Sequence, residues 1–329
     1  MAVIPSFRQG PNPTIDRNPV FRRIREHMWG YVFLLPLILL SLIFVLYPIA
    51  GSFRYAFYNW DGFGDPTQFV GLRHFQRVAT DPFFWNAFKN TVIYTIFLVP
   101  IQLTLALILA LVLNDVRLHL SNFYRAVYFL PVVTSMAVIG VVFSLLFARV
   151  GTNYPHWLVD LGWVNPRLGI MQNPTLVMPV IIAIGIWHTL GLNLVNFLAA
   201  LQTVPKDLYE AATVDGAGRL AKFWYITVPA IRPVGAIILI FAILGSLRVF
   251  DIVWVMTQGG PFYASEVVST YIYSYTFGSK YGTSQANFGY ASAAAIFMSF
   301  LILGLTVLQV LIVARSRRRQ AEMRLDTGA

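Results

Sequence analysis

The sequence between two membrane-length apolar runs reads Leu201-Gln-Thr-Val-Pro-Lys-Asp-Leu-Tyr-Glu210-Ala-Ala-Thr-Val-Asp215-Gly-Ala-Gly218. Pro205 suits the first turn of a helix, where its missing N–H costs nothing. Leu208, Ala211 and Ala212 then recur at helical spacing and give that helix one narrow apolar face. Gly216 is free to adopt a positive φ, so we expect the helix to end there in a tight bend. The stretch therefore predicts a short helical knob at the membrane surface, and a second short helix is expected from Arg219 toward Pro229.

The chain around this knob is too apolar to be solvated by water. Of its 329 residues, 57% are hydrophobic and only 12% are charged, and the mean hydropathy is +0.65. Such a composition lacks the polar surface that a soluble globule of this length needs. A helix needs ~20 apolar residues to cross ~30 Å of hydrocarbon. Runs of at least this length occur at 29–50, 87–113, 126–148, 176–201, 234–256 and 290–314.

We therefore expect an all-α integral membrane protein with six transmembrane helices. The expected organisation is an N-terminal tail at 1–28, a six-helix transmembrane domain at 29–314 that includes the loop at 202–233, and a basic C-terminal tail at 315–329. The chain contains no cysteine, which excludes thiol catalysis, disulfides and cysteine-ligated metal.

The net charge of +10 is a topology signal. Basic residues do not gather into one aromatic-interleaved patch, as a nucleic-acid groove would require, so no nucleic-acid partner is expected. Of the 24 Lys and Arg residues, 16 lie in the two tails and in the loops 114–125 and 202–233, whereas 7 lie in the alternate loops. Positive residues are retained on the cytoplasmic side. Both termini and the knob are therefore expected in the cytoplasm.

Two charged residues fall inside the fifth run. Arg248 and Asp251 are three residues apart, so a continuous helix would place them on one face. Burying either charge costs ~2.5–3.5 kcal/mol even on the lenient insertion scale, so such residues usually face a cavity. Two interpretations stay open: both residues line a substrate pathway, or they neutralise each other as a structural pair.

The residues of the knob resemble a known motif. Glu210-Ala-Ala, followed by Asp215-Gly-Ala and Ile226-Thr-Val-Pro229, is similar to the EAA loop of binding-protein-dependent ABC importer permeases. Further matches to these permeases are Phe69-Val-Gly-Leu-Arg-His-Phe75, Phe129-Leu-Pro131, Val249-Phe-Asp251, Thr257-Gln-Gly-Gly-Pro261 and Phe288-Gly-Tyr-Ala-Ser292. Within the superfamily the chain resembles the carbohydrate group and its MalF-like subunits. Leu220 departs from the pattern, because the group often has tryptophan there.

The resemblance implies a type I ABC importer permease fold, also called MetI-like, in a bacterial or archaeal cytoplasmic membrane. It implies that the chain forms half of the pathway for a sugar, an oligosaccharide or a related polyol or glycerol phosphate. The knob would then be a coupling helix that sits in a groove of the ATPase. The residues that the resemblance assigns to coupling are Glu210, Ala211, Ala212, Asp215, Gly216 and Ala217.

The implied partners are a second permease subunit, an ABC ATPase dimer and an extracytoplasmic solute-binding protein, besides membrane lipid. No lysine follows a glycine in this chain, so the phosphate-binding sequence Gly-x-x-x-x-Gly-Lys-Ser/Thr does not occur. We therefore expect no catalytic residue, no metal and no cofactor on this chain, and we expect ATP and Mg²⁺ on the ATPase subunit.

Polar residues inside the spans are candidates for the substrate pathway: Trp187, His188, Thr189, Ser246, Arg248, Asp251, Thr134 and Ser135. Trp187 either stacks on a sugar face or simply faces lipid. For His188, hydrogen bonding within the helix bundle is the simpler interpretation, and a role as a ligand or proton relay is the alternative. Asn193 and Asn196 are interpreted in the same way, as hydrogen-bonding residues between helices.

Two other classes of protein are weighed against this hypothesis. A membrane-embedded enzyme would need clustered nucleophiles, acids, bases or metal ligands near a membrane face. The sequence has no His-x-x-x-His, no Glu-x-x-His and no paired acidic motif on any external or cytoplasmic segment. A self-contained secondary transporter or channel would show repeated broken spans or several intramembrane carboxylates. Neither class explains the knob.

Overall fold

The computed structural model describes residues 28–114, 119–150, 159–162, 165, 167–278 and 286–326. The chain forms two compact units, Met1–Arg54 and Tyr55–Ala329. The described part of the first unit is one apolar rod made of α2 (Met28–Ser41), the π-helical turn η1 (Leu42–Leu46) and α3 (Tyr47–Tyr55). The N-terminal tail expected at 1–28 lies outside the described residues, apart from Met28, which begins α2.

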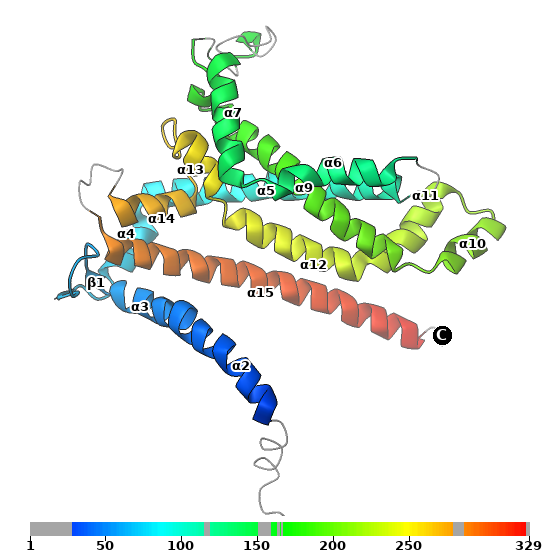
Figure 1. The fold of residues 1–329 in the computed structure, drawn as a ribbon, viewed down its shortest axis with the longest axis horizontal. Helices are drawn as coiled ribbons and strands as arrows, with labels where there is room; N and C mark the ends of the chain where they lie inside the picture. Colours follow the sequence, from blue (N-terminus) through cyan, green and yellow to red (C-terminus); the bar gives the residue numbers. More distant parts are fainter. Residues whose placement is uncertain are drawn as a thin grey trace, which may run out of the picture. The chain divides into compact units, whose positions relative to one another are not determined.

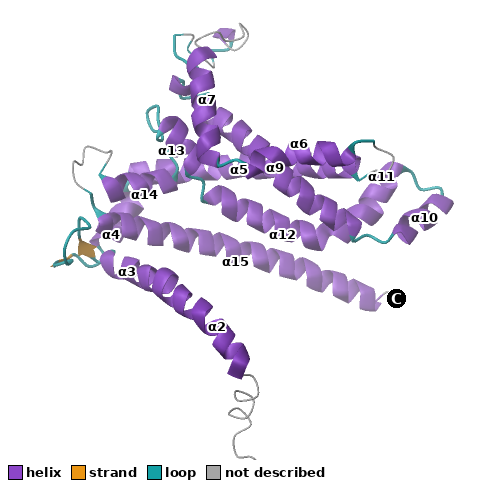
Figure 2. Cartoon of the chain, in the orientation of Figure 1, coloured by secondary structure: helices purple, strands orange, loops and turns teal. Residues whose placement is uncertain are grey.

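In the described residues of the second unit, the secondary structure is helical apart from one small hairpin (Figures 1 and 2). Its strands β1 (Tyr58–Asn59) and β2 (Gln68–Phe69) pair antiparallel, with Tyr58 opposite Phe69. The other elements are α4 (Arg73–Thr80), α5 (Pro82–Leu113), α6 (Ser121–Val133), α7 (Met136–Val150), η2 (Ile170–Gln172), α9 (Val177–Gln202), α10 (Lys206–Val214), α11 (Arg219–Lys222), η3 (Phe223–Thr227), α12 (Val228–Leu247), α13 (Asp251–Thr257), α14 (Val268–Phe277) and α15 (Phe288–Asp326).

The expectation of six spans agrees with five to six candidate spans among the described residues. Five helical stretches are long and apolar enough to cross a membrane, and the bent pair α6–α7 brings the number to six when it is counted as one span. Several helix ends lie about five residues outside the expected runs, such as Tyr55 in place of 50 and Pro82 in place of 87, and the largest difference is that α15 stays helical to Asp326, beyond the expected end of the span at 314. The physical reason is that 305–326 contains neither glycine nor proline and is rich in helix-forming residues.

Two of the expected spans are not continuous helices, which corrects the runs 126–148 and 234–256. The third span bends by 91° between α6 and α7. Pro131 removes one backbone hydrogen bond near this bend, and the β-branched residues that follow it have low helix propensity. The fifth span breaks between α12 and α13, just after the pair Gly245-Ser246. Glycine–serine pairs are a common cause of sharp kinks.

The core lies where α5, α9 and α12 pack along one another. One apolar cluster surrounds Tyr94, Leu98 and Ile181, and a second surrounds Ala106, Leu194 and other residues toward the α10 end of α9 and α12. α6 crosses α9 very closely. A Cβ on Gly191 would lie 2.1 Å from the carbonyl oxygen of Tyr128, and this oxygen belongs to the backbone and cannot rotate away.

A half-buried carboxylate joins four elements at the end of the bundle opposite α10 (Figure 1). Asp81 caps the first turn of α5, and its Oδ2 accepts hydrogen bonds from the hydroxyls of Tyr271 (2.7 Å) and Tyr290 (2.8 Å). The Arg77 guanidinium stands 4.5 Å from the centre of the Tyr290 ring. Burial lowers the pKa of the His74 imidazole in α4, and the charge of Arg77 acts in the same direction. The neutral imidazole therefore sits in this cluster at pH 7.

The close crossing of α6 and α9 can be tested with Gly191→Ala. The added methyl group must push two helix backbones apart, and overpacking of this kind costs ~1–3 kcal/mol. We expect a lower midpoint of thermal unfolding for the purified chain in detergent. Gly304→Ala is the matched control, because a Cβ on Gly304 meets nothing within 4 Å. That control should match or exceed the wild type, since alanine favours a helix interior. Equal midpoints for the two variants would contradict the close crossing.

Candidate functional site

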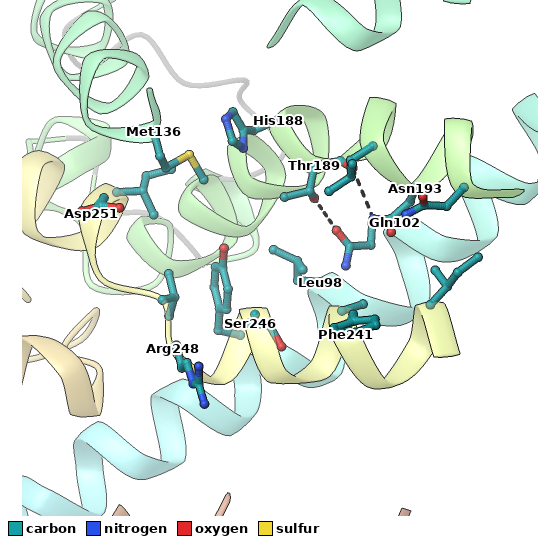
Figure 3. Close-up of a pocket in the computed structure, with 18 of the residues that line it drawn as sticks. Leu98, Gln102, Met136, His188, Thr189, Asn193, Phe241, Ser246, Arg248 and Asp251 are labelled. Carbon is teal, nitrogen blue, oxygen red and sulfur yellow. Dashed lines mark hydrogen bonds between the residues drawn. The ribbon is translucent and has the colours of Figure 1, made fainter. Parts of the chain in front are cut away.

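A cavity of about 730 Å³ lies in the middle of the second unit. Its walls come from α5, α9 and α12, and one end is formed by the break between α12 and α13 together with Met136 at the start of α7 (Figure 3). Both helix breaks of the structure therefore lie beside the same cavity. A cavity of this size could hold a small sugar.

Five of the eight predicted pathway residues line this cavity. These five residues are His188, Thr189, Ser246, Arg248 and Asp251. The structure thus brings together side chains from the fourth and fifth spans. The hydroxyl of Ser246 is buried and lies 3.1 Å from Oγ1 of Thr95 on α5, so it also ties α12 to α5.

The other three predicted residues are not among those that line the cavity. Trp187 is 46% exposed on the outer side of α9, and its ring meets Phe143 of α7 edge-on at 5.8 Å. Thr134 and Ser135 form the break between α6 and α7. His188 Nε2 lies 3.1 Å from the carbonyl oxygen of Thr134 and can donate a hydrogen bond to it. His188 therefore satisfies a backbone group that the break sets free.

Arg248 and Asp251 do not lie on one face of a continuous helix, so that expectation was wrong. Arg248 follows the last residue of α12, Asp251 begins α13, and the backbone between them is not helical. Figure 3 shows their side chains diverging on the two flanks of the break. Both are exposed, and in the described part of the chain no ion pair joins them. The break separates them because the chain turns within Val249 and Phe250.

Sequence reasoning missed two cavity residues on α5, Tyr94 and Gln102. The available signal was a polar stripe along an apolar run, in which Gln102 is the one amide between Val92 and Leu113. Asn193 and Asn196 also line the cavity. The side-chain amide of Asn193 donates to the carbonyl of Thr189 on its own helix at 3.2 Å, and not to another helix.

The predicted knob is present at the end of α9 and α12 (Figure 1). α10 ends at Val214, and Gly216 has a φ of +76°. The amide of Ala217 donates to the carbonyl of Ala212 at 2.8 Å, and the amide of Gly216 donates to that of Thr213 at 3.1 Å. These two bonds form a Schellman motif, which ends a helix with a left-handed residue.

Two side-chain hydrogen bonds fix the inner face of the knob. The hydroxyls of Tyr209 and Thr227 lie 2.9 Å apart, and Lys222 Nζ donates to Oγ1 of Thr213 at 2.7 Å. The second loop helix is not separate, which corrects the expectation. α11 begins at Arg219 and continues through η3 into α12, because proline is tolerated near the first turn of α12.

The outer face of the knob is exposed and combines acidic with apolar side chains. Glu210, Ala211 and Asp215 are exposed, and Val214 is 88% exposed. Ala212 and Ala217 are half-buried beneath them. A small, preformed surface of this composition is suited to close contact with another protein.

Comparisons with known proteins agree with this arrangement. The chain is 34% identical over 291 residues to the lactose transport system permease protein LacF of Rhizobium radiobacter, which covers 88% of this chain and 95% of that protein. The fold is similar to the crystal structure of a bacterial ABC transporter involved in the import of the acidic polysaccharide alginate. The TM-score is 0.75 at 26% identity over 91% of this chain and 99% of that one.

A second solved structure is the bacterial alginate ABC transporter in complex with an alginate pentasaccharide-bound periplasmic protein. Its TM-score is 0.73 at 25% identity, over 89% of this chain and 96% of the other. The family model described as the inner membrane component of binding-protein-dependent transport systems matches residues 82–318. This match contains the cavity, both breaks and the knob. The chain is therefore a multi-pass membrane permease that belongs to the binding-protein-dependent transport system inner membrane component family.

Proposed function

We propose that the chain is one permease subunit of an ATP-driven importer for a sugar, an oligosaccharide or a related polyol compound. The observation that carries this proposal is the combination, within one family match, of a polar cavity at two helix breaks and an exposed knob at the end of the same helices. The similar proteins named above belong to a lactose transport system and to a transporter involved in alginate import. A self-contained transporter or channel would have no use for the preformed outer face of α10.

In this proposal the substrate crosses the membrane along the cavity, between this chain and a second permease subunit. Thr189, Ser246, Arg248 and Asp251 contact it, and His188 holds the break beside it. A solute-binding protein delivers the substrate from outside. The periplasmic protein in one of the similar transporters supports this partner.

The knob contacts a separate ATPase, which holds ATP and Mg²⁺ and performs the hydrolysis. Because α11, η3 and α12 form one continuous helical path, a displacement of α10 is passed to α12 and to the break at Arg248. We place both termini and the knob on the cytoplasmic side. The end of α15 lies at the same end of the bundle as α10, which supports this orientation (Figure 1).

The coupling role of α10 can be tested with Glu210→Arg. Reversing this exposed charge should weaken binding of the ATPase at least about tenfold, since ~1.4 kcal/mol of lost interface energy is a factor of ten. The measurement is mass spectrometry of the proteins that co-purify with the tagged chain from gently solubilised membranes. Wild type should bring down an ATPase and a second six-span permease.

Asp65→Arg is the matched control, because it makes the same change of charge at an exposed position near the hairpin, far from α10. It should retain the ATPase. Loss of the second permease together with the ATPase in Glu210→Arg would indicate failed assembly and would argue against a coupling role. A wild-type chain that comes down alone would make a self-contained transporter the leading hypothesis.

The pathway role of Arg248 can be tested with Arg248→Ala in the complete importer. Loss of a charged hydrogen-bond donor from the substrate path should lower the uptake rate about tenfold or more, while the co-purified amount of ATPase stays the same. Uptake of a radiolabelled sugar into cells provides the measurement. Lys89→Ala, which removes an exposed cation from α5 away from the cavity, serves as the control. Unchanged uptake kinetics in Arg248→Ala would remove this residue from the pathway.

A further inference from the structure

The wall of the cavity formed by α5 has no role in the proposal so far. Tyr94, Leu98 and Gln102 are spaced four residues apart, so they form one stripe along α5, and all three line the cavity. The stripe is deeply buried, with Tyr94 3% exposed and Gln102 2% exposed. The α5 side of the cavity is otherwise apolar, and the stripe adds two polar groups to it, the Tyr94 hydroxyl and the Gln102 amide.

One end of the Gln102 amide is held in place and the other end is free. The hydroxyl of Thr189 forms a short hydrogen bond with Oε1 of Gln102, and it also lies 2.8 Å from the carbonyl of Gly185 on its own helix. The amide nitrogen has no hydrogen-bond partner among the described residues. Figure 3 shows that it points away from Thr189, into the space between α9 and α12. A polar group that is 98% buried and aimed into a cavity indicates a ligand partner.

The hydroxyl of Tyr94 has the same property. It forms no hydrogen bond with any described residue, although the side chain is almost fully buried. It fits against α9 because residue 185 is glycine, since a Cβ there would lie 2.5 Å from the Tyr94 hydroxyl oxygen. Both groups line the cavity, so their hydrogen bonds are made to whatever fills it, water when it is empty and a ligand when one is bound.

A hydroxyl group is the ligand chemistry that matches both residues. It can donate and accept at the same time, so it can complete either end of an amide and either role of a phenol. The α5 wall carries no charge, and an ionic group brought against it would lose its hydration without a counter-charge. The charged residues Arg248 and Asp251 lie at the break, at one end of the cavity.

We propose that the Tyr94 hydroxyl and the Gln102 amide are specificity-determining contacts that bind hydroxyl groups of an uncharged sugar unit at the α5 wall. Thr189 is the positioning residue, because it fixes the amide so that its free end meets the substrate. This inference rests on the proposed import function and goes beyond it by naming the wall, the two groups and the chemistry that they select.

The first experiment measures stability and needs no knowledge of the substrate. Deleting a group that has no hydrogen bond within the protein costs little stability, so Tyr94→Phe should unfold at or above the wild-type temperature. Gln102→Leu loses only the bond from Thr189 and should lower the unfolding temperature less than its control does. The matched controls remove the same groups where they are hydrogen-bonded within the protein. Tyr271→Phe deletes a hydroxyl bonded to Asp81, and Asn90→Leu deletes an amide that donates to the carbonyls of Tyr263 and Glu266.

Both controls should lower the midpoint of thermal unfolding by several degrees, measured on the full-length chain purified with its partner subunits. If Tyr94→Phe and Gln102→Leu lower it as much as the controls do, both groups have structural hydrogen bonds and the proposal is overturned. Gln102→Leu leaves the Thr189 hydroxyl bonded to Gly185, so it creates no new unsatisfied group.

The second experiment measures uptake of radiolabelled lactose, maltose and glycerol 3-phosphate by proteoliposomes that contain the complete importer. For a sugar that the wild type imports, Tyr94→Phe and Gln102→Leu should each lower the maximal rate about tenfold, with the same amount of assembled complex. Gln68→Leu on the exposed hairpin should match the wild type. Unchanged rates in both cavity variants would overturn the proposal.

The two experiments separate failure of this inference from failure of the proposed function. A wild-type complex that imports only glycerol 3-phosphate would overturn the selection of an uncharged unit but not the import function. A wild-type complex that imports none of the three compounds would count against the carbohydrate proposal itself. In that case the unfolding temperatures still decide whether the Tyr94 hydroxyl and the Gln102 amide nitrogen are hydrogen-bonded within the protein or available to a ligand.

Discussion

Hydrocarbon cannot form hydrogen bonds, so every backbone N–H and C=O inside a membrane must find its partner within the protein or face a cavity. This constraint explains why the two broken spans of this permease break beside the same cavity. At the first break the freed carbonyl of Thr134 is met by His188 from the neighbouring span. At the second, the non-helical backbone from Arg248 to Phe250 lines the cavity itself. Both breaks thus leave their irregular backbone where a neighbouring span or the cavity can satisfy it.

The same helix that ends at the cavity begins at the knob. α12 spans Val228–Leu247, which at 1.5 Å per residue is ~30 Å, the thickness of the hydrocarbon layer. Its first turn continues from η3, and Thr227 is bonded to Tyr209 of α10. At the other end Ser246 is bonded to Thr95 of α5. A helix that is hydrogen-bonded to its neighbours at both ends transmits a displacement better than a flexible loop does. A movement of the knob would therefore be passed along α12 to the cavity.

Much of the fold could be predicted from the sequence because its signals are local. Apolar run length gives the spans, and the Asp215-Gly216 pair gives the bend that ends α10. The breaks could not be predicted, because a proline or a Gly-Ser pair inside a span is compatible with both a straight and a broken helix. Neighbouring helices decide between the two. The carboxylate of Asp81 illustrates the same limit, since its partners Tyr271 and Tyr290 are about 190 and 210 residues away in sequence. Tyr94 and Gln102 were missed for a related reason, because only the packed structure shows that they lack protein partners.

The shape of the knob around Gly216 depends on local hydrogen bonds. The bonds that shape it, from Ala217 to Ala212, from Lys222 to Thr213 and from Tyr209 to Thr227, all begin and end within one short segment. The shape of this segment is therefore set mainly by its own residues. If the knob contacts an ATPase and the cavity holds the substrate, as proposed above, the exposed surface of the knob can change with the ATPase while these hydrogen bonds keep its shape, and the cavity at the other end of α12 can change with the substrate. On this proposal, the residues that select the ATPase and the residues that select the substrate lie at opposite ends of α12 and can change independently of each other.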